Sequence, residues 1–129
     1  MLLVIDTNII VNALKSRDSQ AKSVRLMRDI MSGKYTMCVS PEIMQEYQDV
    51  LFRQHLSLNK DSVSRLLNWI KQHAFFIIPK PSSPSSVKMI DEDDRIFFDT
   101  AKCVNARLVT RNYKHYPVHE LITLIDELY

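Results

Sequence analysis

Short apolar runs alternate along the chain with longer segments in which apolar residues recur every three or four positions. The short runs have the length of strands and predict strands buried on both faces, at 2–5, 35–39, 75–78 and 107–110. The periodic segments predict helices, one beginning at 9–11 after capping side chains at 6–8, and the others over 21–31, 41–51, 61–73 and 91–104. The segment 121–128 fits a short strand and a short helix equally well.

Local signals mark several of these boundaries. Ser40 and Pro41 form a helix start, with a capping side chain and a first-turn proline. Gly33, the only glycine, stands where a helix should end, and Asn105 tolerates the left-handed conformation found at helix ends. The Pro- and Ser-rich residues 79–86 predict a loop.

The alternation of strands and helices predicts the fold class. We expect an α/β domain, a three-layer α/β/α sandwich around a central, mostly parallel sheet of four or five strands. The 129 residues fit a single domain spanning 1–129. An apolar fraction of 46% is typical of a globular chain rather than a disordered one.

Net charge, cysteine content and hydropathy limit only slightly which ligands the protein could bind and in which compartment it could act. A net charge of +2 permits nucleic-acid binding without indicating it. Cys38 and Cys103 are too few for a disulfide framework, so we expect free, buried thiols in a reducing compartment. No apolar stretch approaches the roughly 18 residues of a membrane span, and the first five residues are too short for a signal peptide. We therefore expect a cytoplasmic protein.

Acidic residues fall at positions where a parallel sheet binds ligands, beyond the carboxyl ends of its strands. Asp6 follows the first predicted strand directly, and Glu46 lies in the helix after the second. Asp94 opens the helix before the fourth strand, and Asp99 lies five residues further along. Hard divalent cations prefer such oxygen ligands, so these four acids predict a site for Mg²⁺ or Mn²⁺.

Each acid also has a purely structural interpretation. Asp6 could cap the following helix, and Glu46 could lie on a solvated helix face, although it borders the apolar stripe. Acids at 91–94 suit a helix N-terminus, but four in a row exceed what capping needs, and a bound cation would relieve their repulsion. Asp94 and Asp99 point about 140° apart on a helix, which weakens the case for Asp99.

Four segments of the sequence, taken together, resemble the PIN-domain family. They span residues 4 to 117 in the family's order: VIDTN from residue 4, SPEIMQEY from 40, DDRIFFDTAK from 93 and LVTRNYKHYP from 108. Within the family they are most similar to the VapC-like toxin components of bacterial toxin–antitoxin pairs. The resemblance implies a metal-dependent endoribonuclease, with RNA as substrate, and a small antitoxin protein that blocks the site.

The resemblance also assigns roles to individual positions. It implies that Asp6, Glu46 and Asp94 are catalytic metal ligands, and that Asp99 matches a position that is acidic in many members. Polar residues implied to support the site or bind substrate are Asn8, Thr110, Asn112 and Lys114. Many PIN domains carry a further Asp where this chain has Asn112, and Asn is a poorer ligand for Mg²⁺. A second metal position is therefore open unless Asp99 supplies the charge.

The chemistry expected of such a site is hydrolysis by an activated water. The acids would hold one or two ions that lower the pKa of a water and stabilise the leaving oxygen, with no covalent intermediate. Lys114 could contact a phosphate or be a solvated loop cation. For His115 we expect a structural role in the loop rather than that of a general base. Arg95 and Arg111 are near the predicted site and could also meet phosphate.

Other function classes fit less well. A phosphoacceptor receiver domain would need an Asp at the end of a central strand, where this chain has Val39-Ser40-Pro41. A haloacid-dehalogenase-type phosphatase would need a second acid at Asn8. A PIN-like RNA-binding or protein-interaction domain without nuclease activity remains as the alternative.

A homodimer is also expected from the family. Two pairs of apolar helix residues could form its contact or equally belong to the core: Tyr47 with Phe52, and Leu66 with Trp69.

Overall fold

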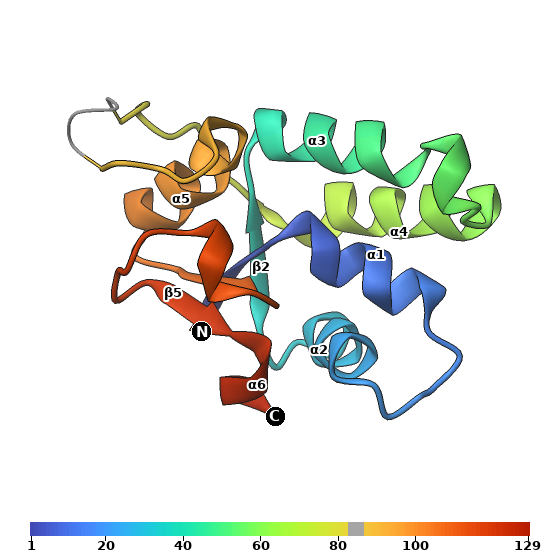
Figure 1. Ribbon diagram of the computed structural model, residues 1–129. Coiled ribbons are helices and arrows are strands. Elements are labelled where there is room, and N and C mark those ends of the chain that lie inside the picture. The colour runs from blue at the N-terminus through green and yellow to red at the C-terminus, as the bar shows by residue number, and fades with distance from the viewer. Residues whose placement is uncertain (83–86) are drawn as a thin grey trace.

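A five-stranded parallel sheet forms the centre of the computed structural model, which describes residues 1–82 and 87–129 (Figure 1). The strand order is β3-β2-β1-β4-β5, and every neighbouring pair is parallel, where the sequence predicted a mostly parallel sheet. The strands are β1 (Leu2–Ile5), β2 (Thr36–Val39), β3 (Phe75–Phe76), β4 (Arg107–Thr110) and β5 (Ile122–Leu124).

Helices cover both faces of the sheet. Figure 1 shows α1 to α4 on one side of β2 and α5 on the other, which confirms the three-layer sandwich. The α-helices are α1 (Thr7–Lys15), α2 (Lys22–Met31), α3 (Pro41–Leu51), α4 (Lys60–His73), α5 (Arg95–Cys103) and α6 (Ile125–Leu128). Three 3₁₀ turns accompany them: η1 (Gln54–Leu56), η2 (Glu92–Asp94) and η3 (Tyr113–His115).

The predicted boundary signals act as expected. The Ser40 hydroxyl accepts a hydrogen bond from the Ile43 backbone N–H at 3.1 Å, and Pro41 is the first residue of α3. Gly33 has a φ of 91° just after α2, and Asn105 has a φ of 54° just after α5. Both residues adopt the left-handed conformation that lets the chain leave a helix and return to the sheet.

Three predicted elements differ in detail. The strand expected over 75–78 is reduced to Phe75 and Phe76 at the sheet edge, and both are exposed, so the expectation of a strand buried on both faces is wrong here. The helix expected from residue 91 begins with the turn η2 before α5. The ambiguous segment 121–128 contains both candidates, because β5 leads directly into α6. Of the predicted loop 79–86, residues 83–86 lie outside the described part of the chain.

The burial of individual side chains tests the expectations for the cysteines and for the dimer contact. Cys38 is buried, and burial raises the pKa of its thiol to about 11, but Cys103 is exposed, so the prediction of two buried thiols is wrong for Cys103. Tyr47 and Leu66 are buried in the core and are not free for a dimer contact, whereas Phe52 is exposed. Within the described residues, no helix is long and apolar enough to cross a membrane.

Candidate metal centre

The sheet topology brings Asp6 and Thr110 together from opposite ends of the chain. Strands β1 and β4 are parallel neighbours, so the residues at their carboxyl ends meet at one edge. The Asp6 backbone N–H donates to the Val109 carbonyl at 3.0 Å, which extends the ladder by one residue. The Thr110 hydroxyl then donates to the Asp6 carboxylate at 2.8 Å. This bond fixes the carboxylate at the mouth of the sheet.

Asp6 occupies the capping position before α1, and only 5% of the residue is exposed. Burial raises the pKa of Asp6, while the hydrogen bond from Thr110 and the charge of His115 act in the opposite direction. The backbone N–H groups of Thr7 and Asn8, at the start of that helix, also act on its carboxylate and lower its pKa. A buried carboxylate with one side-chain donor is a costly feature for a purely structural residue.

Asp94 and Glu46 lie within electrostatic reach of Asp6. Burial, followed by the negative charges of Asp6 and Asp91, raises the pKa of Asp94 to about 7. Burial also raises the pKa of Glu46, while the charge of Arg53 lowers it and the charges of Asp49, Asp93 and Asp6 raise it. We call Asp6, Glu46 and Asp94 the acidic cluster. Asp6 directly follows β1, Glu46 lies in α3 and Asp94 lies in η2, so the members come from segments far apart in the sequence.

The acidic cluster is not a closed metal cage. Among the described residues, no three His, Cys, Asp or Glu side chains are placed closely enough to hold an ion on their own. Mg²⁺ does not need such a cage, because it binds proteins through one or two carboxylates and keeps several waters or substrate oxygens. Mutual repulsion among half-buried carboxylates is what a divalent cation relieves, so the donor set fits such an ion.

Asp99 lies apart from this cluster in the structure, and its role as a further metal ligand stays a prediction. Its carboxylate accepts hydrogen bonds from the Ser82 backbone N–H at 3.0 Å and from the Ser82 hydroxyl at 2.5 Å. It is not among the charges that act most on Asp6, Glu46 or Asp94. The helical rotation between Asp94 and Asp99 turns the second carboxylate toward the segment that follows β3.

Arg95 also has a structural position rather than the phosphate contact that the sequence allowed. It is 8% exposed and forms a bidentate ion pair with Glu92, at 2.6 and 2.9 Å. It donates further hydrogen bonds to the Ser82 hydroxyl and the Val87 carbonyl, each at 2.7 Å. We call Ser82, Glu92, Arg95 and Asp99 the anchoring network, since it fastens the segment before η2 onto α5.

The remaining predicted residues surround the acidic cluster at its solvent side. Asn8 is exposed two residues after Asp6. Asn112 is exposed as well, and its backbone N–H reaches the Thr110 hydroxyl at 3.3 Å. The Asn112 side chain accepts a hydrogen bond from the Lys114 backbone N–H at 2.9 Å, while the Lys114 side chain is exposed. The amide oxygen that would replace an acid is thus partly used in holding the loop.

Sequence reasoning missed Tyr116, which lies beside the cluster. Tyr116 is 3% exposed, and its hydroxyl has no hydrogen-bond partner among the described residues. Burial, and then the charges of Asp6 and Asp94, raise its pKa well above the usual value. A buried hydroxyl without a partner leaves a donor available for a water or substrate oxygen. A signal for Tyr116 was present in the sequence, because it ends the polar run that follows β4, but the run alone indicated no role for it.

The fold and the position of the cluster define a parallel α/β domain with acids at the carboxyl edge of its sheet. The family model for the PIN domain matches residues 2–114, and the chain therefore belongs to the PIN-domain family. Among curated proteins, none matches the chain in sequence. The fold is similar to that of a solved chain described as the crystal structure of VapBC2 from Rickettsia felis bound to a DNA fragment from their promoter. That match has a TM-score of 0.62 and 19% identity, and it covers 96% of this chain and 97% of the other.

Proposed function

We propose that this protein is a metal-dependent endoribonuclease that hydrolyses RNA phosphodiester bonds, with Asp6, Glu46 and Asp94 as ligands of Mg²⁺ or Mn²⁺. The observation that carries the proposal is the buried Asp6 carboxylate, held by Thr110 at the carboxyl edge of the sheet, with Asp94 close enough for the negative charge of Asp6 to raise its pKa. Proteins seldom bury repelling carboxylates with few donors unless a cation or substrate compensates them. Membership of the PIN-domain family supports the same reaction class.

The ion, when bound, would supply an activated water and a counter-charge for the phosphate. The protein's own part is positioning. Thr110 holds the Asp6 carboxylate through its hydroxyl, and burial of both groups fixes that geometry before substrate arrives. The Tyr116 hydroxyl is buried without a hydrogen-bond partner among the described residues, so it leaves a donor for a water beside the cluster. Asn8 and Asn112 are exposed beside it as neutral polar contacts.

We also propose that the protein is the toxin of a toxin–antitoxin pair and acts in the cytoplasm, with a small antitoxin protein as its partner. The likeness to a chain of a VapBC2 complex supports this role at the level of the fold. A homodimer is proposed on the family resemblance. The alternative, a PIN-like domain that binds RNA or protein without cutting, is opposed by the intact acidic cluster.

The test is cleavage of RNA by the purified protein with Mg²⁺ or Mn²⁺. We expect cleavage to require the ion, and the substitution Asp6→Asn to lower the rate by about 100-fold or more, because it removes a buried charge at the proposed metal. Asp18→Asn is the matched control, since Asp18 is an exposed acid in the loop after α1. Cleavage that survives both EDTA and Asp6→Asn would reject the proposal.

A further inference from the structure

Two cavities flank the acidic cluster, and they carry opposite charge. One has a volume of about 480 Å³ and is lined by Asn8, Asn12, Lys15, Arg111, Asn112 and His115. We call it the cationic cleft. The other has a volume of about 360 Å³, and the charged residues that line it are Glu42, Glu46, Asp49, Arg53, Glu92 and Asp93. We call it the acidic cleft.

The cationic cleft opens directly beside the proposed metal. Asn8 lies two residues after Asp6, and Asn112 contacts Thr110, which in turn bonds Asp6. The charge of His115 acts on both Asp6 and Asp94, so this residue also lies close to the cluster. A phosphodiester chain whose scissile phosphate sits at the cluster would therefore reach the cleft with its next phosphate groups.

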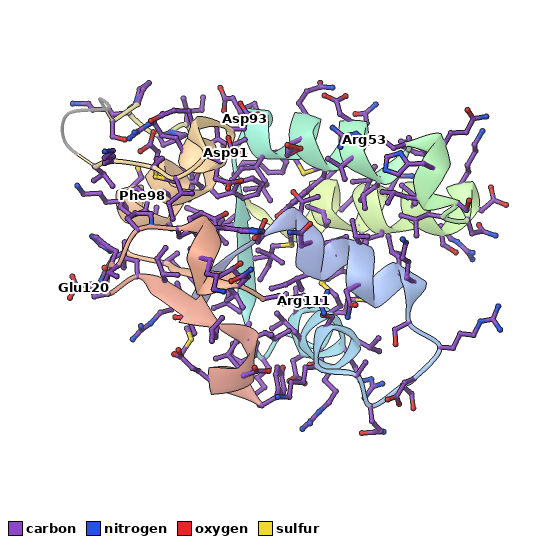
Figure 2. The ribbon with its side chains drawn as sticks, viewed as in Figure 1. Arg53, Asp91, Asp93, Phe98, Arg111 and Glu120 are labelled. Atoms are coloured by element: carbon purple, nitrogen blue, oxygen red, sulfur yellow. The ribbon has the colours of Figure 1, made fainter. Side chains whose placement is uncertain are left out.

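The lysine and the arginine that line this cleft have no carboxylate partner among the described residues. Lys15 and Arg111 are both exposed, and neither forms an ion pair within the described part of the chain. Figure 2 shows Arg111 close to α1, away from Asp91 and Asp93. Arg95, by contrast, is tied to Glu92. Exposed cations free of carboxylate partners keep their full charge for a ligand.

The cleft also holds rigid amide groups. The Asn12 side chain donates to the Ser23 hydroxyl at 3.1 Å, and the Asn112 side chain accepts from the Lys114 backbone N–H at 2.9 Å. Each amide is thus oriented before a ligand binds. Cations supply the affinity for a phosphate backbone, and oriented amides suit its oxygens and sugar hydroxyls.

The acidic cleft is unsuited to the same ligand. Its lining places five carboxylates against a single arginine, Arg53. A polyanion entering this cleft would meet repulsion on most of the surface, and only salt would lessen it. Hence the two sides of the cluster differ in their ability to bind a phosphate chain.

We propose that the RNA is held asymmetrically: the phosphates on one side of the cleaved bond lie in the cationic cleft and contact Lys15 and Arg111. The inference rests on the proposed function, since it takes the acidic cluster as the place of cleavage. Arg111 presents a planar fork to phosphate oxygens, and Lys15 acts as a point charge. The strand on the other side of the bond leaves without a comparable contact.

Binding of a short, labelled single-stranded RNA, followed by fluorescence anisotropy in Mg²⁺, tests this contact without relying on catalysis. In the Asp6→Asn background, we expect Lys15→Gln and Arg111→Gln each to weaken binding about fivefold and to lower the salt slope by about 0.7. Lys60→Gln removes the same charge from the exposed start of α4, outside both clefts, and should leave both quantities nearly unchanged. Equal behaviour of the three variants would overturn the inference.

Cleavage kinetics separate this inference from the proposed function. In the otherwise native protein, Lys15→Gln and Arg111→Gln should raise KM about fivefold while kcat stays within about twofold, because the contacts hold the ground state and transition state alike. If Asp6→Asn abolishes cleavage but the cleft variants match Lys60→Gln, the inference fails and the nuclease stands. If the rate of cleavage is unchanged by Asp6→Asn and by EDTA, the proposed metal-dependent nuclease function is rejected. The anisotropy result then still decides whether the cationic cleft binds RNA.

The direction of the asymmetry follows from shortening the substrate. Removing nucleotides from one end of a singly cleaved RNA should raise KM, and removing them from the other end should change it little. In the Lys15→Gln, Arg111→Gln double variant, shortening that end should no longer raise KM, because the phosphates removed from the RNA and the cations removed from the protein are the two sides of one contact. Equal sensitivity at both ends, unchanged by the double variant, would contradict the proposal.

Discussion

Asp94 and Asp99 stand five residues apart in the same segment, yet the structure gives them different surroundings. Asp94 is half-buried beside Asp6 and Glu46, makes no capping hydrogen bond, and has its pKa raised to about 7. Asp99 is 7% exposed and accepts two hydrogen bonds from Ser82. One carboxylate faces other carboxylates, and the other faces donors.

The difference teaches that burial of an acid does not by itself mark a catalytic residue. A buried carboxylate that is supplied with donors stabilises the fold, as Asp99 does for the segment before η2. A carboxylate surrounded by like charge costs stability and is retained where it binds something. The acidic cluster and the anchoring network thus use the same side chain for different purposes.

The largest expected effect is on cleavage. Asp94→Asn should lower the rate of RNA cleavage at saturating Mg²⁺ by about 100-fold or more, because it removes a charged metal ligand while keeping the shape. Asp99→Asn should stay within a few-fold of the native rate. Initial rates on one RNA substrate give the comparison, and a loss of similar size in both variants would place Asp99 in the catalytic centre after all.

The next effect is on stability, and it should fall on the other residue. Asp99→Asn should lower the free energy of unfolding by about 1–3 kcal/mol, since it weakens the bonds to Ser82 and removes negative charge beside the buried Arg95. Urea unfolding measures the change. Ser82→Ala should cost a similar amount, and the double variant should cost less than the sum, because both changes remove one contact. Additive costs would show that the two residues act separately.

The smallest expected effect is a pH dependence of the metal-free protein. The pKa of Asp94 is about 7 when folded, against an ordinary value of 3.8, so between these pH values the folded chain holds a proton that the unfolded chain has released. Stability contributed by this group therefore falls as pH rises from about 4 to 7. Asp94→Asn should remove that decline and raise the melting temperature at pH 8 by roughly 5 °C in EDTA. Melting curves that are parallel in both proteins across this range would refute it.

Much of the fold could be predicted from the sequence, because its signals are local. Alternating apolar runs and helical periods define the strands and helices, and Ser40, Gly33 and Asn105 act on their own backbone. Asp6 could be placed at the sheet edge without coordinates, since it ends a strand and parallel strands gather their carboxyl ends at one edge. Glu46 and Asp94 were expected near that edge from the helices that carry them and from the family resemblance.

What only the tertiary structure decided is which partners each polar group meets. The sequence offered Asp6 a capping position before α1, and only the folded sheet brought the Thr110 hydroxyl, 104 residues away, into contact with its carboxylate. Asp99 could be separated from the cluster only by its bonds to Ser82, and Tyr116 could be placed beside it only once the loop after β4 was folded. Periodicity fixes a residue's face within its own element, but hydrogen bonds and charges act across space between elements, and their distances depend on how those elements pack.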